Sequence, residues 1–325
     1  MVREIRKSDD MYTRTLRTSC GFAEAMYDST PRISVCIPTY RGAAHLAATM
    51  ESVLAQTVND FELIVVDDNS PDETGAIVAR YGDSRIRYLR NPTNLGPEGN
   101  WNRCLEEARG RYFKLLPQDD LLAPDCLERQ VAVFESDAEQ QIALVFGARN
   151  VADANGKVIM RRVLYGSEAK RIGARDLIRS CVRRGSNIIG EPGNVLLRRD
   201  HVRRIGKFDG TYGYVIDLDY WFRVLQLGDA YYLPDLLSTF RISAGSWSVA
   251  IGRRQYQEFR DFARKYARDP ACRIGRIDLA MATLMACVNA QLRRLAYWWW
   301  LPKQAGPTGG GASAGQVGET TRTRP

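Results

Sequence analysis

Several residue types that support common enzyme chemistries are scarce in this sequence. Its 325 residues include only two histidines, His45 and His201, and none of its seven cysteines forms a CxxC pair. We therefore expect no histidine-based metal site. The odd number and wide scatter of the cysteines predict reduced thiols, as in the cytosol, and neither a disulfide framework nor a zinc site.

Phosphate-binding, hydrolase and membrane signatures are missing as well. The sequence has no GxGxxG, no GxxxxGK[ST] and no GxSxG, which argues against a dinucleotide site, a P-loop NTPase and a nucleophile elbow. The N-terminus shows no apolar stretch typical of a signal peptide. Residues 279–292 are interrupted by Asn289 and Gln291 and are too short to span a bilayer. We therefore expect a cytoplasmic protein, either soluble or peripheral on the inner membrane face.

The composition is that of a globular protein with a basic surface. Apolar residues make up 45% and charged residues 26%, so a sizeable core can be buried. The net charge of +8 suits an anionic partner such as a sugar nucleotide, a phospholipid surface or a nucleic acid. Charge alone does not choose among these partners.

The order of apolar segments predicts an α/β fold. Residues 33–37 and 61–66 are short, near-continuous apolar runs, as expected for parallel strands covered on both faces. Between them, Leu46, Met50 and Val53 follow helical spacing. Ser70, Pro71 and Glu73 resemble a capping box and predict a helix start at Ser70. Further strands are predicted at 85–89, 112–116 and 142–146, with helices around 101–108 and from 124 onward. The alternation predicts a mainly parallel sheet flanked by helices.

The rest of the chain divides by composition. We expect an N-terminal extension over 1–31 and a catalytic domain over 32–250, made of a first half (32–148) and a less regular second half (149–250). The second half should hold strands at 194–197 and 230–233 and a helix over 215–227. Residues 251–302 are Arg-rich and helical in pattern, and 303–325 are typical of a disordered tail.

Polar clusters follow three of the predicted strands. They are residues 38–41, residues 67–70 and residues 118–120. Ligands of parallel sheets bind at the carboxyl ends of the strands, so these clusters should meet on one edge. A single acidic pair is more often an ordinary turn, but two pairs on one edge repel unless a cation or a donor separates them. Asp119 and Asp120 could hold Mg²⁺ or Mn²⁺ together with phosphate oxygens.

A family resemblance follows from a collinear series of motifs. Residues 33–40 (ISVCIPTY), 51–57 (ESVLAQT), 61–70 (FELIVVDDNS) and 114–120 (KLLPQDD) resemble segments of family-2 glycosyltransferases with the GT-A fold. The matching segments also include Asn94-Leu95-Gly96, Asn100-Trp101-Asn102, Gly110-Arg111-Tyr112, Gly206-Lys207-Phe208-Asp209 and Asp217 to Arg223. The resemblance implies a transferase that moves a hexosyl or deoxyhexosyl group from a nucleotide diphosphate to an acceptor hydroxyl.

The resemblance also implies roles for individual residues. Asp120 would hold a divalent cation, Mg²⁺ or Mn²⁺, with Asp119 beside it; Asp68 would bind the base, and Asp217 would be the general base of an inverting reaction. The nucleotide sugar would be bound by Pro38, Thr39, Tyr40, Arg41, Asp67, Asp68, Asn94, Gly96, Asn102, Gln118 and Asp119. The acceptor would be a glycan or a lipid-linked glycan, in surface glycan or polysaccharide synthesis.

Three positions depart from the family pattern. Pro117 replaces the first Asp of a DxD element, Ile216 stands where an acidic residue is commoner, and Ser243 replaces a frequent His. These departures leave an alternative interpretation, a non-catalytic protein that binds a nucleotide sugar or serves as an assembly partner. A solvent-facing helix carboxylate is the alternative interpretation of Asp217. A nucleotidyltransferase is disfavoured because a Gly-rich triphosphate loop is missing.

The C-terminal segment allows two interpretations. Between Arg253 and Arg276 eight basic residues stand against three acidic ones, and residues 297–300 (YWWW) follow Arg293 and Arg294. This surface could contact an anionic membrane leaflet, or its aromatic residues could pack on the catalytic domain. No RNA- or DNA-binding motif accompanies the basic residues, so we expect no nucleic-acid partner.

Overall fold

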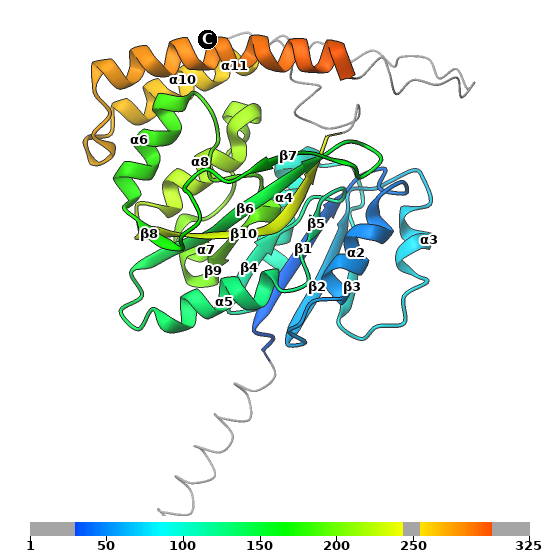
Figure 1. Ribbon diagram of the computed structural model, residues 1–325. Helices are drawn as coiled ribbons and strands as arrows, with labels where there is room; N and C mark the ends of the chain where they lie inside the picture. Colours follow the sequence, from blue (N-terminus) through cyan, green and yellow to red (C-terminus); the bar gives the residue numbers. More distant parts are fainter. Residues whose placement is uncertain (1–29, 243–253, 301–325) are drawn as a thin grey trace, which may run out of the picture.

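The computed structural model describes residues 30–242 and 254–300, with side chains through Arg293 (Figure 1). Most of the expected N-terminal extension, Ser243, the side chains of residues 297–300 and the expected tail lie outside the described residues.

A single ten-stranded sheet runs through the whole described catalytic region (Figure 1). Its strands are β1 (Ile33–Thr39), β2 (Phe61–Asp67), β3 (Ile86–Arg90), β4 (Tyr112–Leu115), β5 (Leu121–Leu122), β6 (Ile142–Ala152), β7 (Val158–Arg162), β8 (Lys170–Ile172), β9 (Val195–Arg198) and β10 (Asp229–Arg241). The main order is β3-β2-β1-β4-β9-β6-β10-β5, with β7 paired to β6 and β8 paired to β10.

Helices cover both faces of this sheet. They are α2 (Leu46–Leu54), α3 (Thr74–Val78), α4 (Gly96–Glu107), α5 (Cys126–Ser136), α6 (Ala174–Arg184), α7 (Arg199–Ile205), α8 (Ile216–Val224), α10 (Gln255–Ala267) and α11 (Arg276–Trp300), with 3₁₀ turns η1 (Pro192–Asn194), η2 (Gly210–Val215) and η3 (Pro270–Cys272). The expected fold class, an α/β sheet flanked by helices with a C-terminal helical extension, is confirmed.

The first four strands of the order are parallel neighbours, which brings the predicted polar clusters together. β1 pairs with β2 on one side and with β4 on the other, and all three run in the same direction. Their carboxyl ends therefore lie on one edge of the sheet. Alternate side chains serve opposite faces: Val35 belongs to the core under α2 and α5, and Cys36 belongs to the core shared with α4 and α8.

Two sequence predictions about element limits were wrong. Helix α3 begins at Thr74 rather than Ser70, and Glu73, the residue before it, makes no side-chain cap hydrogen bond. Ser70 Oγ instead accepts a hydrogen bond from the Arg41 N–H at 2.9 Å, because the loop after β1 lies against it. The strand expected at 142–146 is twice as long, and β6 crosses the expected division between residues 148 and 149.

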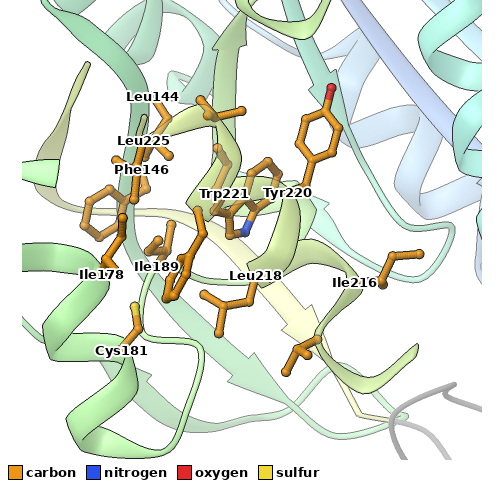
Figure 2. Packing of buried hydrophobic residues seen from close by; sticks show 14 of the residues in the cluster. Leu144, Phe146, Ile178, Cys181, Ile189, Ile216, Leu218, Tyr220, Trp221 and Leu225 are labelled. Carbon is orange, nitrogen blue, oxygen red and sulfur yellow. The ribbon is translucent and has the colours of Figure 1, made fainter. Parts of the chain in front are cut away.

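The second half of the region is built around α8, whose apolar face points into the core (Figure 2). Leu218, Trp221 and Leu225 follow helical spacing and pack near Phe146 of β6 and Ile178 of α6. The Trp221 indole N–H donates to the Gly190 carbonyl at 3.1 Å, so a buried polar atom gains its partner and the chain around Gly190 is held over α8.

The C-terminal helices lie together along one edge of the molecule, beside α6 and α8 (Figure 1). Phe262 and Tyr266 of α10 are buried against Phe222, and the buried Phe259 packs on Phe262, which makes α10 part of the main core. Helix α11 crosses α6 closely at Gly185, where a Cβ would lie 2.4 Å from the Ala286 nitrogen. No described helix is long and apolar enough to cross a membrane.

Candidate active site

The loop after β1 is fastened to the loop after β4 by the side chain of Gln118. Its Oε1 accepts hydrogen bonds from the Thr39 hydroxyl and, at 2.9 Å, from the Tyr40 N–H, while its Nε2 donates to the Tyr40 carbonyl at 3.1 Å. The Gln118 carbonyl accepts from Thr49 Oγ1 at 2.7 Å. Two of the three predicted polar strand ends are therefore joined directly, and the Tyr40 ring is exposed beside the junction.

The same loop is joined to the end of β2. The Asp68 N–H donates to the Thr39 carbonyl at 2.8 Å, and the Arg41 N–H donates to Ser70 Oγ. Arg41 has a positive φ of 53°, and its guanidinium lies 5.3 Å from the Tyr40 ring centre. Three strand ends that are 29 to 79 residues apart in sequence thus form one connected edge.

The two carboxylates after β2 are buried and bound by the protein itself. Asp67 accepts from the Ser70 N–H at 2.9 Å and from the Tyr88 hydroxyl at 2.5 Å. Asp68 accepts from the Leu95 N–H at 2.8 Å and from the Gly96 N–H at 2.9 Å, as well as from Asn91 Nδ2. Asp68 therefore shapes the start of α4 in this structure, and its reading of a base stays a prediction.

Two other predicted ligands of the nucleotide sugar also have partners within the protein. Asn94 Nδ2 donates to the Asp68 carbonyl at 3.1 Å, beside Gly96, which has a φ of 73°. Asn102 pairs with the main chain of Phe208 through two hydrogen bonds, of 2.7 and 3.2 Å, and is buried. These two hydrogen bonds join α4 to the second half of the chain and involve none of the three strand ends.

Asp119 and Asp120 lie where a cation would offset their charge. Asp120 is 1% exposed, and its pKa is held well above the usual range by burial and then by the charges of Asp119 and Glu191. The pKa of Asp119 is raised as well, chiefly by burial. The Arg241 N–H donates to Asp120 Oδ1 at 3.0 Å. Adjacent carboxylates with raised pKa values are a donor set that fits a hard divalent cation.

These two residues would not complete a cation's coordination alone. Among the described residues no group of three or more His, Cys, Asp or Glu side chains could hold a metal ion. Mg²⁺ and Mn²⁺ commonly bind one or two carboxylates and take their other ligands from substrate phosphates and water. His45 stands nearby, with Nδ1 2.6 Å from Arg241 Nη1, and its pKa is lowered by burial and by that guanidinium.

Asp217 lies in the first turn of α8 and is half-buried rather than solvent-facing. Its Oδ2 accepts from Asn187 Nδ2 at 2.8 Å, and its Oδ1 accepts from the Leu218 N–H at 2.7 Å. Burial and, second, the charge of Glu191 raise its pKa to about 7, against those two hydrogen bonds, which favour the charged form. A carboxyl group with a pKa near neutrality is suited to proton transfer.

Buried polar side chains hydrogen-bond to the main chain of the turn that carries Asn187 and Glu191. Lys114, fully buried in β4, donates to the carbonyls of Gly193 and Val195 at 2.9 and 3.2 Å. Asn194 Nδ2 donates to the Ile189 carbonyl at 2.9 Å. Because these groups have lost water, their hydrogen bonds fix the main chain in one place. The turn links the two acidic sites, since Glu191 raises the pKa of both Asp120 and Asp217.

The family model described as Glycosyl transferase family 2 matches residues 34–206, which is more than half of the chain. This chain belongs to glycosyl transferase family 2. As a member of the family, it is a glycosyltransferase. Its matched residues include all three polar strand ends and the turn around Glu191.

Relatives with curated sequences support the same membership. An uncharacterized protein of Mycobacterium tuberculosis is 33% identical over 227 residues, covering 68% of this glycosyltransferase and 70% of the relative. The UDP-Glc:alpha-D-GlcNAc-diphosphoundecaprenol beta-1,3-glucosyltransferase WfgD of Escherichia coli is 31% identical over 145 residues, covering 43% and 56%.

Solved structures show the same fold. S. aureus TarS residues 1–349, in complex with UDP-GlcNAc, aligns with a TM-score of 0.60 and 17% identity over 83% of this glycosyltransferase and 76% of that chain. The mannosyltransferase PcManGT from Pyrobaculum calidifontis, in complex with GDP-Man and Mn²⁺, aligns with a TM-score of 0.57 and 19% identity over 86% and 77%. The fold is therefore GT-A.

Sequence reasoning missed several polar and charged residues of this candidate site. Asn187 and Glu191 lie in a segment without clear periodicity, and Arg149 Nε approaches Glu191 Oε2 at 2.6 Å from β6, 42 residues earlier. The one local signal was the Gly190-Glu191-Pro192-Gly193 run, whose Gly and Pro residues indicate a specific turn.

Proposed function

We propose that this family-2 glycosyltransferase is an inverting, metal-dependent enzyme that transfers a hexosyl or deoxyhexosyl group from a nucleotide diphosphate to an acceptor hydroxyl. The observation that carries the proposal is Asp217. It is a half-buried carboxyl with a pKa near 7, bound by Asn187, and electrostatically linked through Glu191 to the acidic pair at Asp119 and Asp120. A proton acceptor and a cation site beside one turn are what this reaction requires.

The donor would bind along the edge formed by the ends of β1, β2 and β4. The main chain of residues 38–41 would hold the nucleoside, and the buried carboxylates after β2 would shape the base pocket. Asp120 and Asp119 would hold Mg²⁺ or Mn²⁺, which when bound neutralises negative charge on the diphosphate. Two GT-A structures with nucleotide sugars, one of them with Mn²⁺, support this assignment.

Asp217 would act on the acceptor. Its unprotonated carboxylate takes the proton of the acceptor hydroxyl as the oxygen attacks the anomeric carbon from the side opposite the leaving diphosphate. That in-line attack inverts the anomeric configuration. Asn187 keeps Oδ2 oriented, and the Leu218 N–H holds Oδ1, so the carboxylate need not reorganise when the acceptor arrives.

The acceptor is proposed to be a glycan or lipid-linked glycan in surface glycan or polysaccharide synthesis, reached from the cytoplasmic side. The name of the WfgD relative, which includes a sugar diphosphoundecaprenol, supports a lipid-linked acceptor. The six described cysteines form no disulfide, which fits a reducing compartment.

An apolar stripe on α11 supports contact with a membrane surface. The α11 stripe comprises Ile277, Met281, Leu284, Val288 and Leu292, whose side chains are 38% to 72% exposed. Their spacing of three and four residues aligns them along about 24 Å of helix. A row of exposed apolar side chains this long marks an interaction surface.

The charge pattern around the α11 stripe favours an anionic bilayer as its binding partner. Between residues 277 and 292 the sole charged side chain is Asp278, which is 1% exposed and pairs with Arg179 and Arg183 of α6. Exposed arginines, Arg273 and Arg276, precede the stripe, so an uncharged row is bordered by positive charge. That arrangement is typical of helices lying in the interface of anionic membranes.

The test is turnover of UDP-, GDP- and dTDP-sugars with Mn²⁺, by the native enzyme and by Asp120→Ala. We expect one donor class to be turned over by the native enzyme and not by the variant. Asp200→Ala is the matched control, because that side chain is 88% exposed and away from the site. No turnover of any donor, or equal turnover by Asp120→Ala, would contradict the proposal and favour a non-catalytic protein.

A further inference from the structure

Two arginines face each other across the β6–β7 hairpin. Arg149 and Arg162 are directly opposed in the antiparallel register, so both side chains stand on the same face. Arg149 is buried, with 1% of its surface exposed, and Arg162 is half-buried. Like charges directly opposite each other destabilise a strand pair. A ligand of negative charge would relieve that repulsion.

The protein itself supplies little counter-charge. Glu191 Oε2 lies 2.6 Å from Arg149 Nε, and it is the carboxylate that pairs with Arg149. In the described part of the chain no carboxylate lies within 4.0 Å of the Arg162 guanidinium. Arg149 Nη2 is buried and has no hydrogen-bond partner there. An unpartnered guanidinium nitrogen is costly to bury, which indicates a binding group missing from the free enzyme.

A third guanidinium borders the same place. Arg293 of α11 lies 5.2 Å from the ring centre of Tyr214, and its Nε is also buried without a described hydrogen-bond partner. The pKa of Arg162 is lowered by burial first and then by Arg149, with a further contribution from Arg293, while Glu191 opposes the shift. Arg149 and Arg162 therefore share the Glu191 carboxylate, and Arg293 adds a further positive charge near Arg162.

This cluster adjoins the candidate base. The Gly190 carbonyl accepts from Asn187 Nδ2 at 2.9 Å, and the same nitrogen donates to Asp217 Oδ2 at 2.8 Å. On the other side of the turn, a Cβ at Gly190 would lie 3.0 Å from Arg149 Nη1. Asp217 and Arg149 thus flank a single residue, Gly190, on the acceptor side of the site.

We propose that Arg149 and Arg162, with Arg293 at the border, bind a phosphate or diphosphate group carried by the acceptor. Guanidinium groups offer planar pairs of N–H donors that match phosphate oxygens. Asp119 and Asp120, which belong to the loop after β4, would serve the donor diphosphate separately. The assignment of this anion to the acceptor rests on the proposed function, whereas the anion site itself does not.

The first test measures inorganic pyrophosphate binding by calorimetry, with EDTA present and no nucleotide. We expect Arg162→Gln to weaken pyrophosphate binding about tenfold. Arg162→Lys should weaken it less, because lysine keeps the positive charge and loses only the planar pair of N–H donors. Arg161→Gln is the matched control: Arg161 is the preceding residue of β7, is exposed, and stands on the other face. The proposed anion site would be overturned by any of three results: pyrophosphate binding that is unchanged in Arg162→Gln, no pyrophosphate binding by the native enzyme, or equal losses of affinity in Arg162→Gln and Arg161→Gln.

The second test compares two acceptors that differ only in charge, a sugar alkyl diphosphate and the corresponding neutral alkyl glycoside. We expect Arg162→Gln to raise KM for the diphosphate acceptor about tenfold and to leave the neutral acceptor and donor hydrolysis unchanged. An equal increase in KM for both acceptors would overturn the assignment of the bound phosphate to the acceptor. If no nucleotide sugar is turned over at all, the proposed function fails, while the pyrophosphate result still decides whether the anion site exists.

Discussion

The main-chain N–H of Arg241, at the end of β10, donates a hydrogen bond to Asp120 Oδ1 at 3.0 Å. The two residues are 121 positions apart, and the bond joins the last strand of the sheet to the loop after β4. Both this bond and the Arg241 charge favour the ionised form of Asp120. They do not outweigh burial and the charges of Asp119 and Glu191, so the pKa of Asp120 remains high.

Cation binding should therefore release a proton. Its raised pKa means that the Asp120 carboxyl holds a proton more tightly than an ordinary carboxyl, and it must be ionised to hold Mg²⁺ or Mn²⁺. We expect the apparent affinity for Mn²⁺, with a nucleoside diphosphate present, to rise with pH as the acidic pair ionises. Calorimetry in two buffers of different ionisation enthalpy measures the released protons directly.

The exposed Asp200→Asn should leave this behaviour unchanged, whereas Asp120→Asn should remove both the proton release and most of the affinity. Mn²⁺ affinity that is independent of pH, or that survives Asp120→Asn, would count against the cation site.

Asp217→Asn should separate binding from transfer. Asn has the same shape and can still accept from Asn187 or from the Leu218 N–H, but it cannot take a proton from the acceptor. We expect transfer to fall by about 10²- to 10⁴-fold with little change in donor affinity. Steady-state rates and titration with the nucleoside diphosphate measure the two effects. Transfer at a near-native rate would remove Asp217 from the role of general base.

The pH dependence of transfer offers an independent check on Asp217. Because its pKa is about 7, the rate should rise as the pH increases through that value, when the carboxyl loses its proton. Glu191→Gln removes a charge that raises this pKa and should move the rising limb to lower pH. Asn187→Ala removes a hydrogen bond that lowers it and should move the limb to higher pH. Limbs that stay in place, or shift in the same direction, would contradict the assignment.

The pKa of Asp217 also determines how its contribution to the free energy of unfolding changes with pH. The folded-state pKa of Asp217 lies above the ordinary value of 3.8, so the folded protein binds more protons than the unfolded chain between about pH 4 and 7. The contribution of Asp217 to the free energy of unfolding should therefore decrease as the pH rises through that window. Asp217→Asn should flatten this part of the stability curve, as measured by urea unfolding at several pH values.

The sequence was informative where the physical signal is local. Buried runs such as residues 61–66 indicate a strand covered on both faces, and the polar residues that end such strands must meet on one edge. The insertion of β9 between β4 and β6 could not be predicted, because that pairing depends on residues far apart in the chain. The start of α3 was misread because Ser70 has a partner in the loop after β1 rather than within its own helix.

The charged part of the site was hidden for the same reason. Arg149 pairs with Glu191, and Asn187 with Asp217, over 42 and 30 positions, and Asn187 and Glu191 lie in a turn whose sequence follows neither helical nor strand spacing. Arg162 is one of two consecutive arginines, and only the strand register shows that it faces Arg149 while Arg161 does not. Spatial contacts of this kind leave no pattern in a single sequence.

The α11 stripe predicts binding to anionic vesicles. Burying exposed apolar side chains in a lipid interface is favourable, and nearby arginines add attraction to negative headgroups. Co-sedimentation should show binding to vesicles of phosphatidylglycerol and phosphatidylcholine, weaker binding to phosphatidylcholine alone, and loss of binding at high salt. Leu284→Glu places a charge at a site that is 64% exposed, so it should reduce binding about tenfold or more without affecting folding.

Val158→Glu provides the control, since Val158 is an exposed apolar residue on β7 and does not belong to the α11 stripe. It should bind vesicles as the native protein does. If Leu284→Glu binds equally well, the stripe does not contact lipid. A row of apolar residues at three- and four-residue spacing also suits helix pairing. If the native protein does not bind vesicles but forms a dimer that Leu284→Glu dissociates, the α11 stripe contacts a second copy of the chain instead of lipid. Sedimentation velocity of both variants separates these outcomes.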